Sequence, residues 1–564
     1  MSGLDALPAW ARELSEKYYS QTLTMFALHG NVRDLVPLRT GEQTQFLPLH
    51  RFLRQGLFPN RDLMLTYDRG SGVVFAEPDM QQDFRRAIEG YDRFHGTSYS
   101  AALPRNPDGV LTLLDNYLRL RIADGKKIAL VIDFAETIAP AGDNSGLSAE
   151  DRNSLVTLKR WAQNPAFLNA DLTICLIAEN LAELNPGLVR NPGVAPIAIP
   201  LPDQPERVEY ICASGPLAAE DSITPDTLAT LTAGLRRVQI QSMVADARNN
   251  RRPLTMKFLA ARKKELIEAE SGGFLEFVQS RFTLDMVAGN EAAKNKLRDA
   301  AAALRAGRTE VLPMGYVICG PVGTGKTFLT TCFAGDVGIP AVTLKNFRSM
   351  WQGETEANLE RVLSLLRAMS PIAVIVDEAD AQLGTRSSSG DSGVGNRVFA
   401  QIAAFMGNTE LRGKVIWFLL TCRPDLLPVD LKRQGRAEEH IALFYPDTLE
   451  ERRALLTAMQ KKCGIPLSSE VTEYFADRSA GLSGADIEAV LTRGHMRAVL
   501  AGSPAVGRGN IQAVLDDFVP PSYPSEIELQ NLVAVLESTS RSLLPEKYRS
   551  ADRAELLRRL RELL

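Results

Sequence analysis

The segment that most constrains this chain has the form of a phosphate-binding loop, Gly320-Pro321-Val322-Gly323-Thr324-Gly325-Lys326-Thr327. It follows an apolar run, 316–319, and leads into residues 328–334, whose composition suits a helix. This strand, loop and helix order is the context that the motif requires. Glycines let successive backbone N–H groups turn toward phosphate oxygens, and the start of the helix adds its positive dipole end. The sequence therefore predicts that all eight residues bind a nucleotide within an α/β fold.

Two further pairs of side chains supply the expected chemistry. Lys326 is expected to reach the β- and γ-phosphates, and Thr327 to ligate magnesium. The apolar run 372–376 ends in Asp377 and Glu378, and ligands bind at the carboxyl ends of parallel strands. We expect Asp377 to hold Mg²⁺ through water and Glu378 to polarise the attacking water. The alternative is a solvated acidic strand end, which the complete loop upstream disfavours.

Four segments in and around these motifs carry a family resemblance. Residues 346–358 resemble the pore-loop segment of AAA ATPases, particularly the second ring of valosin-containing protein. Residues 420–425 and 431–436 are similar to the second region of homology of that clade, and residues 481–486 resemble the start of its lid helix. The resemblance runs from about Phe282 to Asp517 with the motifs in the expected order.

The resemblance implies roles for residues outside the phosphate loop. Arg433 and Arg436 align with the arginine fingers that act on a neighbouring subunit, and the alternative for either is a solvated charge at a helix end. Gly484 and Ala485 would border the adenine and ribose. Trp351 and Gln352 would lie on a loop facing a central pore, where an aromatic side chain grips an extended polypeptide. The alternative for Trp351 is a core tryptophan, which its polar flanking residues disfavour.

The sequence departs from the family pattern at two positions. Cys422 stands where the family has a polar sensor asparagine, although Thr421 beside it could donate a hydrogen bond to the nucleotide. The residues around Arg436 also differ, since Gln434-Gly435-Arg436-Ala437-Glu438 replaces a Pro-Gly-Arg-Phe-Asp pattern, so Arg436 is a less secure finger than Arg433. These departures predict slow hydrolysis.

Composition excludes several classes of protein. The 564 residues suggest three or four domains by size. The net charge of −4 gives no overall basic signal for nucleic acid. Six scattered cysteines without C-x-x-C pairs indicate a reducing, cytoplasmic location rather than a zinc site. We expect no membrane span, because no apolar run reaches ~18 residues, and no signal peptide at the N-terminus.

The N-terminal half repeats the architecture of the C-terminal half. The strand-like run 127–133 ends in Asp133, as the catalytic strand ends in Asp377. From Asp133 to Arg190 is 57 positions, and from Asp377 to Arg433 is 56. A long-period repeat of this kind indicates duplicated domains. The alternative is an unrelated α/β domain whose spacing agrees by coincidence.

The N-terminal half lacks the chemistry of the other half. Its first strand, 23–28, leads into His29 and Gly30 with no lysine for phosphates, and Phe134 follows Asp133 where the second half has a glutamate. We therefore expect a core that has lost catalysis. This pairing of a degenerate N-terminal module with an active C-terminal module resembles the hypothetical-chloroplast-frame ATPases of plastids and cyanobacteria. Two segments, 271–277 and 390–399, also resemble that group locally.

The predicted fold class is α/β, with two tandem AAA+ modules, each a parallel-sheet core of the P-loop type plus a helical lid, the N-terminal module being degenerate. Beyond a Pro/Ser break at 520–524, the patterns 526–543 and 551–564 predict amphipathic helices that pack on the chain's own lid or a neighbour, or alternatively dock an adaptor. The predicted domains are a core without a phosphate loop over 1–203, its lid over 204–275, an active core over 276–446, a second lid over 447–519, and a helical tail over 520–564.

The leading functional hypothesis is a homo-oligomeric ring, expected to be a hexamer, that couples ATP hydrolysis to remodelling, unfolding or disassembly of protein substrates. The second is a nucleotide-gated assembly factor or scaffold that threads nothing. The third, a nucleic-acid motor or loader, is disfavoured by the acidic balance of the chain. The substrate and any adaptor are left open.

Overall fold

The computed structural model describes most of the chain, in two compact units. The described residues are 6–41, 43–142, 146–215, 223–250, 253–278, 280, 282–345, 355–383, 394–503, 505–519 and 523–564. Unit 1 comprises residues 1–267 and 356–368, and unit 2 comprises residues 268–355 and 369–564. Trp351, Gln352 and most of the Ser/Gly segment 386–395 lie outside the described residues, so the pore-loop prediction stays untested.

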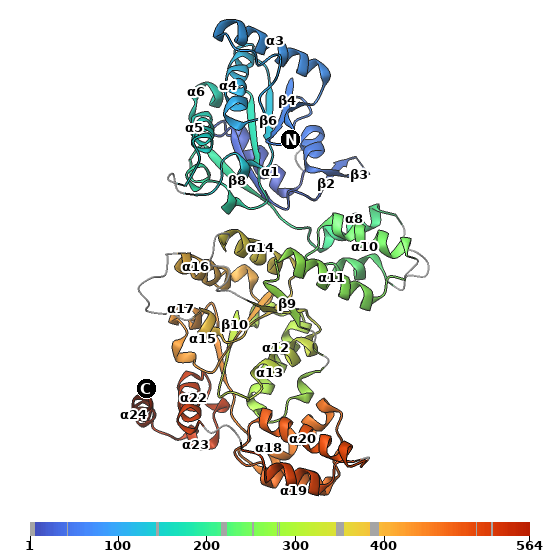
Figure 1. The fold of residues 1–564 in the computed structure, drawn as a ribbon, viewed down its shortest axis with the longest axis vertical. Coiled ribbons are helices and arrows are strands. Elements are labelled where there is room, and N and C mark those ends of the chain that lie inside the picture. Colours follow the sequence, from blue (N-terminus) through green and yellow to red (C-terminus); the bar gives the residue numbers. More distant parts are fainter. Residues whose placement is uncertain are drawn as a thin grey trace. The chain divides into compact units, whose positions relative to one another are not determined.

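Unit 1 is built around a six-stranded, mainly parallel sheet (Figure 1). Its strand order is β5-β4-β6-β7-β1-β8, and only β5 runs antiparallel to its neighbour. The β4–β5 connection is a hairpin that contains Gly70 and Gly72. The strands are β1 (Met25–Gly30), β4 (Leu63–Asp68), β5 (Gly72–Phe75), β6 (Ile128–Ile132), β7 (Leu172–Ile177) and β8 (Val194–Ile199).

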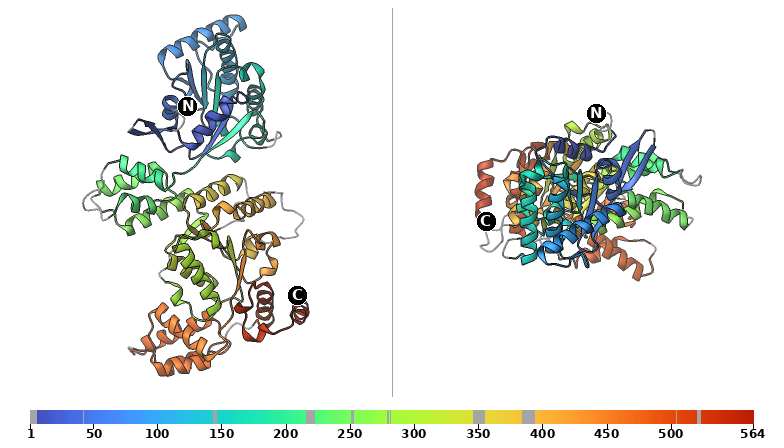
Figure 2. Two further views of the ribbon diagram at one scale, coloured as in Figure 1. Left: turned by 180° about the vertical axis from the view of Figure 1, so that it is seen from behind. Right: turned by 90° about the horizontal axis from the view of Figure 1, so that it is seen from above.

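Both faces of this sheet are buried, which is why its strands are almost continuously apolar. Along β1, Met25 and Ala27 belong to one core, whereas Phe26 and Leu28 belong to the other. Figures 1 and 2 show helices on the sheet. The first core includes α3 (Pro78–His95), α4 (Pro107–Ala123), α5 (Ala149–Gln163), α6 (Pro165–Leu168) and α7 (Pro186–Val189); the second includes α1 (Ala9–Tyr19), β2 (Leu35–Thr40), β3 (Gln43–Pro48) and α2 (Leu49–Phe52).

Unit 2 contains a second sheet, β14-β10-β13-β12-β11-β9, in which the five parallel strands follow the same order as in unit 1, whereas the antiparallel edge strand β9 comes before the others in the chain. Read from its other edge, the first sheet is β8-β1-β7-β6-β4-β5, so β1 corresponds to β10 and β6 to β12. The predicted repetition of one α/β architecture is confirmed. The strands are β9 (Leu275–Val278), β10 (Gly315–Cys319), β11 (Ala341–Leu344), β12 (Ile372–Val376), β13 (Val415–Thr421) and β14 (Glu439–Ala442).

The helices around the second sheet place the functional loops. Leu297 of α12 and Phe333 of α13 pack with β10, β12 and β13 in one core. The α13 helix starts at Lys326, directly after the phosphate loop. These helices are α12 (Glu291–Arg305), α13 (Lys326–Val337), α15 (Ala379–Leu383), α16 (Val394–Met406) and α17 (Val429–Lys432), while α14 (Thr355–Ala368) lies between β11 and β12 in the chain and is grouped mainly with unit 1.

Helices follow each sheet along the chain. Those after the second sheet share an apolar core, and Ser483 caps α20 through a reciprocal pair of bonds with Asp486. The first set is α8 (Gln204–Ala213), α9 (Pro225–Leu231), α10 (Arg237–Asn249) and α11 (Met256–Glu270); the second is α18 (Leu449–Cys463), α19 (Ser469–Arg478), α20 (Gly484–Leu500) and α21 (Arg508–Leu515).

The tail contains α22 (Pro524–Glu537), α23 (Glu546–Arg549) and α24 (Arg553–Leu563). The predicted helix over 526–543 is wrong in its last third, because α22 ends at Glu537 and Thr539 bonds to β14. Its N–H donates to the His440 carbonyl at 3.2 Å, and its hydroxyl accepts from the His440 N–H at 3.1 Å. The α24 helix packs against α22, with Leu556 buried.

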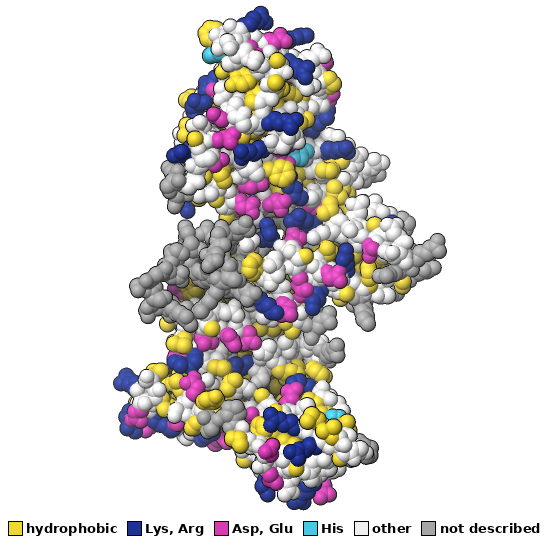
Figure 3. Space-filling view, in the orientation of Figure 1, with side chains coloured by type: hydrophobic (Ala, Val, Ile, Leu, Met, Phe, Trp, Pro, Cys, Tyr) yellow, Lys and Arg dark blue, Asp and Glu magenta, His cyan; other side chains and the backbone are white. Residues whose placement is uncertain are grey.

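Basic and acidic side chains are interspersed on the face drawn in Figure 3, over both units. Within the described part of the chain, no helix combines the length and apolar character needed to cross a bilayer.

Candidate active site

The phosphate loop has the backbone form that its glycines predict. Gly320, Gly323 and Gly325 have φ angles of 138°, 80° and 85°. A side chain at Gly320 is excluded, because its Cβ would lie 2.1 Å from the Leu443 carbonyl oxygen. The first N–H groups of α13 have no partner within the helix and point toward the loop. These features fit an anion such as a nucleotide phosphate.

Lys326 lies over the loop. Its Nζ donates to the carbonyl oxygens of Gly320 at 2.8 Å and Pro321 at 3.0 Å, and it lies 3.1 Å from the Cys422 Sγ. The ammonium group is therefore held at the mouth of the loop, where it can exchange these contacts for phosphate oxygens.

Thr327 and Asp377 come together, as the sequence predicts. The Thr327 hydroxyl donates to the Asp377 carboxylate at 3.0 Å, and the other Asp377 oxygen accepts the Glu378 N–H at 2.9 Å. Hydroxyl and carboxylate oxygens beside a phosphate loop are the ligands that Mg²⁺ prefers, so the residues present fit this ion. Glu378 adopts a left-handed backbone with φ of 47°. Such strain is frequent at functional sites.

At the sensor position, the Thr421 side chain is hydrogen-bonded within the protein. The Thr421 hydroxyl, nearly fully buried, donates to Asp380 at 2.7 Å and accepts the Arg423 N–H at 2.8 Å. A hydroxyl has one proton, and here Thr421 uses it in a structural hydrogen bond. Cys422 is the side chain that contacts Lys326.

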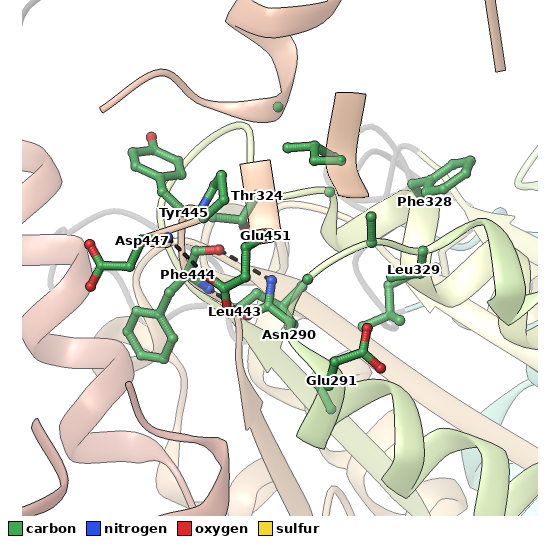
Figure 4. A pocket seen from close by; sticks show the side chains of 18 of the residues that line it. Asn290, Glu291, Thr324, Phe328, Leu329, Leu443, Phe444, Tyr445, Asp447 and Glu451 are labelled. Atoms are coloured by element: carbon green, nitrogen blue, oxygen red, sulfur yellow. Dashed lines mark hydrogen bonds between the residues drawn. The ribbon is translucent and has the colours of Figure 1, made fainter. Parts of the chain in front are cut away.

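A cavity of about 400 Å³ adjoins the phosphate loop, within the ~300–1,000 Å³ typical of small-molecule sites. Its wall includes apolar side chains from α13, β14 and the lid, which suit a nucleotide base. Asn290 shapes one side of it, because its amide bonds both backbone groups of Phe444, at 3.2 Å and 3.0 Å (Figure 4).

The lid reaches the same cavity. Gly484 and Ala485 line it together with Gly323, Thr324 and Gly325. A side chain at Gly323 would lie 2.9 Å from Ser483, so the loop and the start of α20 are in close contact. The structure thus brings together the predicted phosphate and base contacts.

The two candidate arginine fingers differ in exposure. The Arg433 side chain is 58% exposed and forms an ion pair with Asp430 at 3.3 Å. The Arg436 side chain is 13% exposed and donates to the Asp430 carbonyl at 2.8 Å. The Arg433 side chain is therefore largely exposed, whereas Arg436 is engaged within the chain.

The corresponding strand end in unit 1 has the same backbone with different side chains. Phe134 follows Asp133 with φ of 49°, and its N–H donates to Asp133 at 2.8 Å, as Glu378 donates to Asp377. Arg33 and His50 each contact the Asp133 carboxylate at 2.8 Å. Burial raises the pKa of Asp133, but the hydrogen bonds from His50 and Arg33 outweigh it and bring the pKa to about 2.

Arg33 also lies over the Phe134 ring, 4.0 Å from its centroid. The carboxylate at the position that corresponds to Asp377 is thus engaged by side chains of unit 1 itself. The next residue, Asp34, is buried and accepts the N–H groups of Arg237 and Val238 at the start of α10, at 3.0 Å and 3.1 Å. The turn that follows β1 in unit 1 is therefore hydrogen-bonded to the start of α10.

Several residues of the site were not predicted from the sequence. Asn290 follows a glycine and has φ of 49°, and a Gly-Asn pair was an available turn signal. Tyr445 donates its hydroxyl to the Val322 carbonyl at 2.7 Å, and Gln530 accepts the Val322 N–H at 3.1 Å. Residues Ser542–Pro545 of the tail line the cavity. No local pattern marks these long-range contacts.

Three family models match the chain. Residues 2–200 match the model described as AAA+ chaperone, N-terminal Rossmann-like domain, and residues 206–272 match AAA+ chaperone, second helical domain. Residues 316–445 match the model for the ATPase family associated with various cellular activities (AAA).

Curated relatives resemble part of the chain. A cell division cycle protein 48 homolog from Archaeoglobus fulgidus is 33% identical over 190 residues, which is 33% of this chain and 26% of that protein. An ATP-dependent zinc metalloprotease FtsH 1 from Sphaerobacter thermophilus is 29% identical over 280 residues, 47% of this chain and 42% of that protein. Protein SAV from Sulfolobus acidocaldarius is 32% identical over 190 residues, 33% of this chain and 24% of that protein. The chain thus spans less than half the length of these three relatives.

Proposed function

We propose that this chain, an AAA+ protein with a Rossmann-like N-terminal domain, a helical domain and an AAA ATPase module, couples ATP hydrolysis to the remodelling of other proteins. The observation that carries this proposal is the convergence of Lys326, Thr327, Asp377 and Glu378 on one loop beside a cavity that the lid also lines.

Each residue has a distinct task in this proposal. The backbone N–H groups of the loop and Lys326 bind and orient the phosphates. Thr327 and Asp377 hold Mg²⁺, which offsets charge that develops on the phosphates. Glu378 orients the attacking water. Cys422 stands at the sensor position, and a thiol donates a weaker hydrogen bond than an amide, so turnover is slow.

Assembly completes the site. Arg433 is exposed and is expected to reach the nucleotide of a neighbouring subunit in a homo-oligomeric ring, expected to be a hexamer. Arg436 serves first to fix the loop that carries Arg433. Trp351 and Gln352 are expected to contact a polypeptide in the pore.

The decisive experiment separates binding from turnover. Lys326→Ala should abolish ATP binding, because no other side chain in the loop offers a positive charge. Glu378→Gln should retain binding and lose turnover. Nucleotide affinity and phosphate release are measured on both variants. Normal turnover by the Glu378→Gln protein would overturn the assignment.

A nucleotide-gated scaffold is the second candidate. It is favoured by Cys422 at the sensor position and by the self-neutralised Asp133 of unit 1. Turnover that rises when an unfolded protein is added supports remodelling, whereas turnover indifferent to any protein substrate supports the scaffold.

A further inference from the structure

The helix α22 joins the two parts of the molecule to which ATPase chemistry is assigned. Near its middle, the buried Gln530 accepts the Val322 N–H of the phosphate loop at 3.1 Å. Glu526, one turn earlier, accepts from the Gln530 amide nitrogen at 3.0 Å and so fixes which end of the amide faces the loop. Because Tyr445 holds the Val322 carbonyl, both backbone groups of this loop residue are held.

The C-terminal end of α22 binds the segment that carries Arg433. Glu537 contacts the Lys432 Nζ at 2.9 Å and the His440 Nδ1 at 3.0 Å. The three side chains of Lys432, Glu537 and His440 are only 12%, 16% and 9% exposed. Ion pairs this sheltered from water hold their geometry far better than surface pairs do.

The His440 ring adds to this fixation. Its Nε2 lies 3.1 Å from the Lys432 carbonyl and 3.0 Å from the Ala437 carbonyl, while Nδ1 faces oxygens of Glu537. Both ring nitrogens thus face acceptors, so a doubly protonated ring satisfies every contact. Ala437 and Lys432 flank the short turn that contains Arg433 and Arg436.

Glu537 lies seven residues after Gln530, which places both side chains on one face of α22, about 10 Å apart along its axis. One end of this face therefore contacts the subunit's own phosphate loop. The other end contacts the residue directly before the arginine offered to the next subunit.

We infer that α22 is a positioning element of the ATPase, in which Gln530 sets the phosphate loop in its own subunit and Glu537 sets Arg433 for the neighbouring site. This inference rests on the proposed function, because it requires Arg433 to act between subunits. Simple packing of the tail predicts instead that damage at either end of α22 lowers stability and all kinetic constants together.

The two ends should have different kinetic signatures. Gln530→Leu frees the Val322 N–H and should raise the KM for ATP in the subunit that carries it. Glu537→Asp keeps the charge but withdraws the carboxylate by one methylene, and it should lower kcat in the neighbouring subunit with KM unchanged. A misplacement of about 1 Å costs roughly 10²-fold in rate.

Mixed assemblies test this directly. A donor subunit carries Lys326→Ala and an intact Arg433; an acceptor carries Arg433→Ala and an intact phosphate loop. Mixing them should restore turnover that neither has alone. Adding Glu537→Asp to the donor should reduce the restored turnover at least tenfold, and adding it to the acceptor should leave it unchanged.

The matched control is Glu528→Gln, which breaks an ion pair between α22 and Arg559 but touches neither the loop nor the Arg433 segment. Melting temperatures are recorded for every variant, and Glu537→Gln is compared with Glu537→Asp. If mixing restores nothing, the intersubunit role of Arg433 fails, and the inference fails with it. If mixing restores turnover and the Glu537→Asp donor performs like the unmodified donor, the inference alone is overturned.

Discussion

Replacing Arg33 with Met should destabilise unit 1, because Arg33 neutralises the buried Asp133. The pKa of Asp133 is about 2 against an ordinary 3.8. One pKa unit corresponds to about 1.4 kcal/mol, so ionised Asp133 contributes about 2.5 kcal/mol to folding at neutral pH. Arg33→Met leaves His50 and the Phe134 N–H at the carboxylate but removes the hydrogen bond and the charge of Arg33, and the expected loss is about 2 kcal/mol.

The sign of the pH dependence follows from the lowered pKa. The contribution of Asp133 is fully present above pH 3.8 and is lost as the pH falls toward the folded pKa of about 2. The difference between the variant and the parent should therefore narrow to about 1 kcal/mol near pH 3.

Hydrogen exchange of the β1 and β6 amides is the appropriate assay, because a chain with two units does not unfold in a single two-state step. Arg39→Met is the control: it breaks an exposed pair with Glu209, and such pairs contribute about 0–1 kcal/mol. The double change Arg33→Met with Asp133→Leu should recover most of the stability. Equal protection of the Arg33→Met and parent proteins at pH 7 would refute this reasoning.

Four further predictions concern nucleotide, assembly, substrate and pH. The chain should bind one nucleotide, and Lys326→Ala should leave none; one remaining equivalent would show that unit 1 binds nucleotide. Specific activity should rise with protein concentration, and Arg433→Ala should keep ATP affinity while losing ~10³-fold in turnover; a fully active monomer would contradict this. Trp351→Ala should retain ATP turnover and melting temperature but fail to unfold a substrate, whereas a core tryptophan would cost roughly 3–5 kcal/mol. Burial lowers the pKa of His440, but its hydrogen bond and charge interaction with Glu537 raise the net value above 6.5, so protection of the α22 amides should fall as pH rises through that pKa, and His440→Gln should abolish this fall.

The motifs that are contiguous in the sequence could be predicted, because their chemistry depends on local backbone. Lys326, Thr327, Asp377 and Glu378 lie on one strand–loop–helix unit and on the end of a strand nearby in the sheet, and parallel order fixes their approach. The repeated sheet could be predicted for the same reason, since its buried strands are apolar and recur at similar spacings in the two halves of the chain.

Contacts between residues that lie far apart in the sequence could not be predicted. Gln530 meets Val322 across 208 residues, and no periodicity marks a buried glutamine as the partner of a loop amide. For Thr421 the limit of prediction is different. Sequence places it beside the sensor position, but whether its hydroxyl faces the nucleotide or Asp380 depends on side-chain direction at the strand end.

The residues that follow the aspartates at the ends of β6 and β12 share a left-handed backbone but differ in side-chain chemistry. Phe134 and Glu378 have φ angles of 49° and 47°, and each bonds back to the preceding aspartate. One is expected to orient a water molecule, and the other stacks under an arginine. A strained backbone at a strand end is therefore not a signature of catalysis in this fold. A search for active sites by backbone shape alone would therefore select both strand ends. Only the side chains distinguish them, because Asp133 is bound by Arg33, whereas Asp377 lies beside the phosphate loop.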